Sequence, residues 1–151
     1  MKKLLGLVLL CAILAAPGCV GTKYYIQDGQ VTNKFLQVST NTMMTTRATW
    51  YNTQDAFAKA KIAGMMTDAQ WNSWSSVDAK FRASQNALTE VLKVYAGMLQ
   101  QLATADQAGD AASVSQIESK MSAKEALINS ALANITGILV EGQNLLTAVQ
   151  Q

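Results

Sequence analysis

Histidine is absent from this 151-residue sequence, and so are the residue patterns that carry common chemistry. Histidine is the side chain used most often as a general base and as a metal ligand near neutral pH. The sequence also contains neither a glycine-rich phosphate-binding loop nor a G-x-S-x-G nucleophile motif. Its carboxylates are scattered along the chain instead of paired. We therefore expect a protein that is not an enzyme and that holds no metal or cofactor.

Proline and net charge are scarce as well. The one proline is Pro17, so no later residue of this type interrupts a long helix. Lysine and arginine together number 12 against 10 acidic residues, and Lys2 and Lys3 account for the whole difference. From Cys19 onward the chain has no excess positive charge and no basic cluster, which argues against a nucleic-acid partner.

The N-terminus has the pattern of an export signal. Lys2 and Lys3 precede an apolar stretch from Leu4 to Ala16, which is followed by small residues. The stretch is too short to cross a bilayer as a helix, which needs about 20 residues. Cys11 lies inside it, where a cysteine behaves as a small hydrophobic residue. We expect Cys11 to leave with the signal peptide.

The end of this segment, Ala16-Pro17-Gly18-Cys19, resembles the lipobox of bacterial lipoproteins, a run of small residues that closes on cysteine. The resemblance covers residues 1–19 only, and no family is recognised for the mature domain. It implies cleavage between Gly18 and Cys19, a diacylglycerol on the Cys19 sulfur and an acyl chain such as palmitate on the new amino group. Two or three such chains anchor a protein firmly. In enteric-type bacteria aspartate after the cysteine marks inner-membrane retention, so Val20 implies the outer membrane.

Loss of the leader without lipidation is the alternative. Cys19 would then be a lone thiol, because no second cysteine survives to form a disulfide. Residues 20–30 carry two glycines and little periodicity, which predicts a tether. The expected organisation is therefore a signal peptide over 1–18, a lipidated tether over 19–30 and a helical bundle over 31–151.

Three helices are predicted in the bundle, and the central one is the clearest. Thr67, followed three residues later by Gln70, forms a capping-box pattern that predicts the start of a helix. Gly109 is typical of a helix end, and Asp110 can cap the next helix. The central helix is therefore predicted over about 67–107. Apolar residues recur in it every seven positions, as in a coiled seam. They are Trp74, Phe81, Leu88, Tyr95 and Leu102. A coiled seam has a second apolar position in each seven-residue repeat. That position is also mostly apolar here, but in two repeats it is polar, at Asp78 and Gln85.

The flanking helices follow from the same spacing. Leu36, Met43, Trp50 and Phe57 recur every seven residues, although seven Ser or Thr between 39 and 53 are a poor helix composition. Isoleucines and leucines at three- and four-residue steps fill 114–149, where polar residues argue against a membrane span. The fold class is all-α, an elongated antiparallel bundle of three long helices.

A register follows if the first two helices fold back on each other at Gly64–Met66. In this antiparallel register, each step forward along the first helix matches one step back along the second. The expected contacts are Leu36–Tyr95, Met43–Leu88, Trp50–Phe81 and Phe57–Trp74. The same reasoning about the turn at 109 places Gly137 opposite Phe81, where a glycine gives room for the ring. Met43-Met44 and Met65-Met66 are expected to put one methionine of each pair in the core, because neighbours on a helix point about 100° apart.

These features favour a structural or protein-interaction role, such as a spacer, adaptor or assembly factor. The expected partners are the membrane, through lipidated Cys19, and either another protein or a second copy of the chain. The alternatives are a mobile-element envelope lipoprotein, of the exclusion or lysis type, and a secreted soluble helical binding protein. The expected location is the cell envelope, facing the periplasm.

Overall fold

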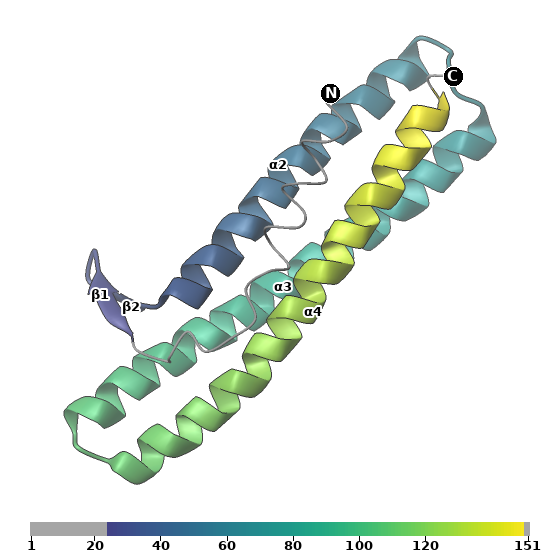
Figure 1. The fold of residues 1–151 in the computed structure, drawn as a ribbon. Helices are drawn as coiled ribbons and strands as arrows, with labels where there is room; N and C mark the ends of the chain where they lie inside the picture. Colours follow the sequence, from purple (N-terminus) through teal and green to yellow (C-terminus); the bar gives the residue numbers. More distant parts are fainter. Residues whose placement is uncertain (1–23, 150–151) are drawn as a thin grey trace, which may run out of the picture.

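The computed structural model describes residues 24–149. They form a short hairpin, β1 (Tyr25–Gln27) and β2 (Gln30–Thr32), followed by the helices α2 (Lys34–Ile62), α3 (Asp68–Gln107) and α4 (Ala111–Val149). The three helices run alternately up and down beside one another, which confirms the predicted antiparallel bundle (Figure 1). No helix in this part of the chain is both long enough and apolar enough to cross a membrane.

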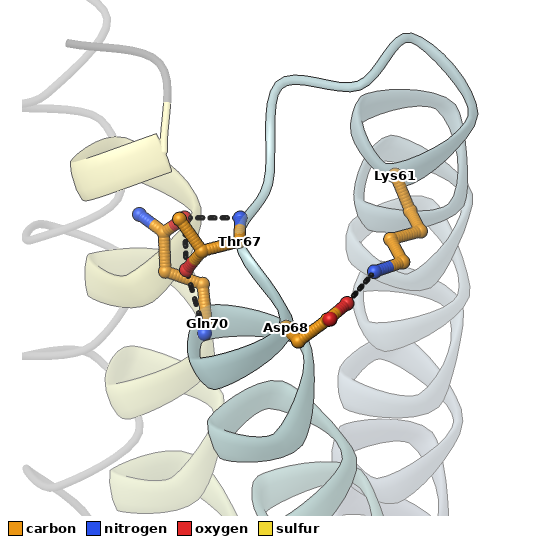
Figure 2. A network of polar contacts seen from close by, with 4 residues as sticks. All are labelled: Lys61, Thr67, Asp68 and Gln70. Carbon is orange, nitrogen blue, oxygen red and sulfur yellow. Dashed lines mark hydrogen bonds and ion pairs between the residues drawn. The ribbon is translucent and has the colours of Figure 1, made fainter.

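The ends of α3 are those that the sequence predicts. Thr67 is the N-cap: its hydroxyl accepts from the Gln70 N–H at 3.2 Å, and the Gln70 side chain accepts from the Thr67 N–H at 2.8 Å (Figure 2). Lys61, near the end of α2, forms an ion pair at 2.8 Å with Asp68 at the start of α3. Gly64 and Gly109 follow the ends of α2 and α3 with φ of +70°, the left-handed conformation that glycine adopts readily.

The threonine-rich part of α2 is helical throughout. Four of its threonines satisfy their hydroxyl groups within the helix, because each donates to the carbonyl four residues earlier; they are Thr42, Thr46, Thr49 and Thr53. Threonine has a low helix propensity, so tertiary packing must stabilise this part of α2. Trp50 and Phe57 provide that packing, because each is at most 1% exposed.

Part of the predicted tether over residues 19–30 has regular structure in the stretch that the structure describes. From Tyr25 the chain forms the two-stranded hairpin, in which Ile26 pairs with Val31. Asp28 and Gly29 make its turn with φ of 51° and 76°, which fits the Asp-Gly preference of tight hairpins. The Tyr24 hydroxyl donates to Asp106 at 2.8 Å, at the far end of α3. The hairpin is therefore held by the bundle.

The hairpin also lies beside the part of the α3–α4 pair that α2 is too short to reach. α2 has 29 residues, whereas α3 has 40 and α4 has 39, so the α3–α4 pair extends beyond the start of α2. The hairpin lies beside this extension (Figure 1), and Tyr24 and Val31 pack against the core there. Apolar surface near the 108–110 turn is thus partly covered by β-structure.

The predicted register between α2 and α3 is confirmed in the middle of the bundle. The rings of Trp50 and Phe81 stack with centroids 4.0 Å apart, and those of Phe57 and Trp74 stack at 3.9 Å. The other two pairs remain predictions. Near them, Thr89 donates to the Met43 sulfur at 3.6 Å, and Tyr95 packs against Phe35 with ring centroids 5.3 Å apart.

The prediction for Gly137 is wrong. A Cβ added there would meet nothing within 4 Å, so no ring requires that glycine. The glycine that receives an aromatic ring is Gly142, where an added Cβ would lie 2.7 Å from Trp50 Cζ3. The register that places Gly137 opposite Phe81 also places Asn134 opposite Ser84, and Asn134 donates to Ser84 at 3.2 Å. That register concerns α3 and α4 only, so it does not predict Gly142, where the ring comes from α2.

Candidate functional site

Four aromatic rings form a continuous stack between α2 and α3. Their order is Phe57, Trp74, Trp50, Phe81, so that the rings come alternately from the two helices. The Trp50 and Trp74 rings are 4.9 Å apart with planes inclined by 24°. Such pairs contribute about 0.5–1.5 kcal/mol beyond the area they bury. The stack holds the two helices in one register and forms a rigid apolar wall.

Asp78, the polar residue in the seam of α3, anchors this wall. Its carboxylate accepts from the Trp50 indole N–H at 2.8 Å, from the Gln54 side-chain amide and from Arg82 Nε at 2.8 Å. Burial of the Asp78 carboxyl favours the protonated form, but the hydrogen bonds from Trp50, Arg82 and Gln54, with the Arg82 charge, outweigh it and lower the pKa. Asp78 therefore works as an ionised hydrogen-bond acceptor that fixes the Trp50 ring.

A cavity of about 190 Å³ lies beside the Trp50–Phe81 end of the wall, and we name it the α2–α3 cavity. Trp50 and Phe81 contribute the apolar part of its lining and are each 1% exposed. Polar side chains make up much of the remainder, from both helices: Arg47, Tyr51, Gln54, Arg82, Gln85 and Asn86. The lining includes no carboxylate.

Gln85 is the second polar residue of the α3 seam; it contributes to the lining of the α2–α3 cavity, and its side-chain amide has an unpaired group. Its Nε2 is excluded from solvent and has no hydrogen-bond partner, which is true of no other buried side-chain nitrogen or oxygen in residues 24–149. A buried donor without an acceptor costs about 1–3 kcal/mol. The nearby seam carboxylate of Asp78 accepts from Trp50, Gln54 and Arg82 and not from Gln85.

The two arginines of the cavity differ in how their charge is balanced. Arg82 is paired with Asp78, which raises the pKa of the Arg82 guanidinium. Arg47 instead donates through Nε to the Tyr51 hydroxyl at 2.9 Å, and its guanidinium carbon lies 5.5 Å from the centre of the Tyr51 ring. The neighbourhood thus carries about one uncompensated positive charge.

A separate polar cluster joins the three helices near the start of α2. The Tyr95 hydroxyl accepts from Asn33 Nδ2 at 2.9 Å and donates to Glu125 at 2.5 Å. Asn33 is also the N-cap of α2, since its side chain accepts from the Leu36 N–H. Burial and the bond to Glu125 raise the pKa of Tyr95, although the bond from Asn33 acts in the opposite direction. This cluster is internally satisfied, so its role is structural.

The residues of the predicted lipidation site, Gly18 and Cys19, lie outside the described residues. The methionine pairs behave as expected, because Met66 is 7% exposed while Met65 is 54% exposed, and Met43 packs on the core while Met44 is 56% exposed. Within residues 24–149 no group of three or more His, Cys, Asp or Glu side chains could hold a metal ion.

Sequence reasoning singled out Asp78 and Gln85 by their polarity in an apolar seam, but it missed Arg47 and Tyr51. Their spacing of four residues allows contact on a helix, but many exposed pairs share it. Comparison with known proteins adds nothing to these assignments: no protein family, curated protein or solved structure matches the chain.

Proposed function

We propose that this chain is a lipid-anchored protein of the bacterial envelope with a structural or protein-interaction role. The observation that carries the proposal is the Ala16-Pro17-Gly18-Cys19 sequence, which follows an apolar leader and precedes the hairpin and the bundle. Acylated Cys19 holds the protein at the outer membrane, and the bundle faces the periplasm.

The geometry of the bundle supports a spacer or adaptor. Tyr24 is bonded to Asp106, so the described chain begins near the 108–110 turn. Only four residues separate Cys19 from Tyr24, so their Cα atoms lie at most about 18 Å apart. The 108–110 turn is then the membrane-proximal end. α3 is about 60 Å long at 1.5 Å per residue, so the 63–66 turn lies far from the lipid and carries the exposed side chains of Ile62 and Met65.

Substitution of Cys19 by serine tests the anchor. We expect the Cys19→Ser protein to leave the membrane fraction, and we expect the wild-type N-terminal peptide to carry the mass of the acyl chains. Cys11→Ser is the matched control, because that cysteine belongs to the leader and its loss should leave anchoring intact. A Cys19→Ser protein that stays in the membrane, or an unmodified Cys19 in the wild type, would exclude the anchor and favour the secreted alternative.

Distance to the lipid surface tests the spacer role. Fluorophores are placed on cysteines introduced at Asp110 or Met65 in the Cys11→Ser background, and energy transfer is measured to acceptor lipids in vesicles that carry the acylated protein. We expect stronger transfer from position 110 than from position 65. Equal transfer from both positions would mean that the bundle lies flat on the membrane, and a spacer role would then be wrong.

A further inference from the structure

The α2–α3 cavity has the chemistry of a binding site. A rigid aromatic wall closes one side, and the Asp78 bonds hold that wall in place. Arg47 and Arg82 belong to the lining, and so does Tyr51, which is 51% exposed. At about 190 Å³ the cavity is smaller than the roughly 300–1,000 Å³ of sites for drug-sized ligands. It therefore suits one small molecule or a single side chain.

The unpaired donor decides what kind of group would fit. Gln85 Nε2 needs an acceptor, and no acceptor of the described chain reaches it. Arg47 and Arg82, which line the same cavity, can only donate hydrogen bonds, so a group that binds there must present oxygens rather than N–H groups. A carboxylate offers two such oxygens and matches the fork of a guanidinium.

Charge distinguishes a carboxylate from a phosphate. Asp78 already balances Arg82, and Arg47 has only the Tyr51 hydroxyl and ring as partners, so about one positive charge is available. A carboxylate carries one negative charge, whereas a phosphate group carries about 1.5 to 2 near neutral pH. A monoanion is therefore the better match.

We propose that the α2–α3 cavity binds a carboxylate group, with Gln85 Nε2 and the Arg47 guanidinium as its donors and with Trp50, Tyr51 and Phe81 against the apolar part that bears it. The carboxylate comes either from a small free acid or from an aspartate or glutamate side chain of a protein partner. This proposal stands on the cavity alone and does not depend on the lipid anchor.

The test uses the full chain purified from membranes in a non-ionic detergent and calorimetric titration with defined probes. Benzoate represents the free acid, and benzamide is its neutral analogue. The peptide acetyl-Ala-Glu-Ala-amide offers only a side-chain carboxylate, and the same peptide with glutamine is its control. We expect saturable binding of benzoate or of the glutamate peptide, at least about tenfold tighter than the neutral analogue. Whichever of the two binds more tightly identifies the source of the carboxylate.

Two variants connect binding to the cavity. Arg47→Gln should weaken binding of the carboxylate probe by at least about tenfold, whereas Lys59→Gln, which removes the same charge elsewhere on α2, should not. Gln85→Leu should weaken binding at least about fivefold without lowering the melting temperature of the free protein, because the unpaired donor is gone. A merely structural glutamine would instead lose stability and leave binding unchanged.

Three results would overturn the proposal. They are the absence of saturable binding for every carboxylate probe, binding of the neutral analogues with equal affinity, and tighter binding of inorganic phosphate than of benzoate and the glutamate peptide. Carboxylate binding that is insensitive to both Arg47→Gln and Gln85→Leu would also exclude this cavity as the site.

Discussion

The Trp50 indole lies directly against the backbone of Gly142, so that a Cβ on Gly142 would come within 2.7 Å of Trp50 Cζ3 and 3.4 Å of Trp74 Cζ3. The ring cannot move aside easily, because it is stacked between Trp74 and Phe81 and its N–H is bonded to Asp78. Gly142 therefore brings the backbone of α4 into contact with the aromatic wall.

Gly142→Ala should lower the free energy of unfolding. Overpacking a well-filled core typically costs about 1–3 kcal/mol, and the gain of up to about 1 kcal/mol in helix propensity offsets only part of it. The matched control is Gly137→Ala on the same helix, where an added Cβ meets nothing within 4 Å. That variant should be more stable by up to about 1 kcal/mol. Urea denaturation measures both, and equal effects of the two substitutions would contradict the packing described here.

Acid should weaken the bundle partly through Asp78. Its pKa is lower in the folded protein than in the unfolded chain, where it is about 3.9, so the unfolded chain binds more protons in acid. This contribution to stability is fully present above about pH 5 and is lost as the pH falls through the folded pKa. Asp68 and Asp110 have lowered pKa values as well and share the effect.

Asp78→Asn isolates that contribution. The amide oxygen can still accept from Trp50, but the amide nitrogen would face Arg82, so we expect about 1 kcal/mol lower stability at pH 7. The difference from the wild type should shrink between pH 5 and pH 2, as thermal unfolding at several pH values would show. Asp55→Asn, which removes one partner of the exposed Lys59–Asp55 pair, is the control with an expected change below about 0.5 kcal/mol. A difference that does not depend on pH would rule out an ionised Asp78 as the acceptor.

Tyr95→Phe should destabilise the junction of the three helices. The substitution leaves the side chain of Asn33, which is 1% exposed, without the acceptor that it has in the wild type. A loss of about 1–3 kcal/mol follows from one unsatisfied buried donor. Tyr25→Phe is the control, because Tyr25 is 41% exposed and should tolerate the change. Chemical denaturation of both variants provides the measurement.

The same tyrosine gives an opposite dependence at high pH. Burial and the bond to Glu125 raise the pKa of Tyr95 above its usual value near 10, so the folded protein keeps this proton after the unfolded chain has lost it. The resulting stability is present below about pH 10 and is lost as the pH rises further. Tyr24, whose hydroxyl bonds to Asp106, contributes in the same direction. The decline should be smaller in Tyr95→Phe than in the wild type, and an unchanged slope would count against it.

Patterns of a few residues were sufficient to predict most of the helical fold. Thr67 and Gln70 fix the start of α3 because two reciprocal hydrogen bonds need that spacing. Trp50 and Phe81 could be paired because a seven-residue repeat keeps large side chains on one face through several turns. The Asp28-Gly29 turn carries an equally local signal, but strands of three residues are too short to give a clear periodicity, so the segment also fits a tether.

The remaining features depend on contacts that no spacing rule contains. Gly142 is required by a ring from α2, and a register worked out for α3 and α4 alone cannot show it. The candidate site depends on Gln85 having no partner, which is a property of the whole environment. A sequence shows that a seam position is polar, but only the packed structure shows whether that group finds an acceptor.

Val31→Asp should release the hairpin from the bundle. Val31 is partly buried and packs on the core, whereas its strand partner Ile26 is 64% exposed, so Ile26→Asp adds the same charge without the same loss of packing. We expect the amides of residues 25–32 to exchange with solvent at least about tenfold faster in Val31→Asp than in Ile26→Asp, while α3 stays protected. Equal exchange in the two variants would mean that Val31 does not hold the hairpin. Release would also lengthen the connection between Cys19 and the bundle from the four residues before Tyr24 to the thirteen before Asn33, which lets Cys19 and Asn33 lie up to about 50 Å apart. A docked hairpin therefore limits how far the bundle can move from an anchored Cys19.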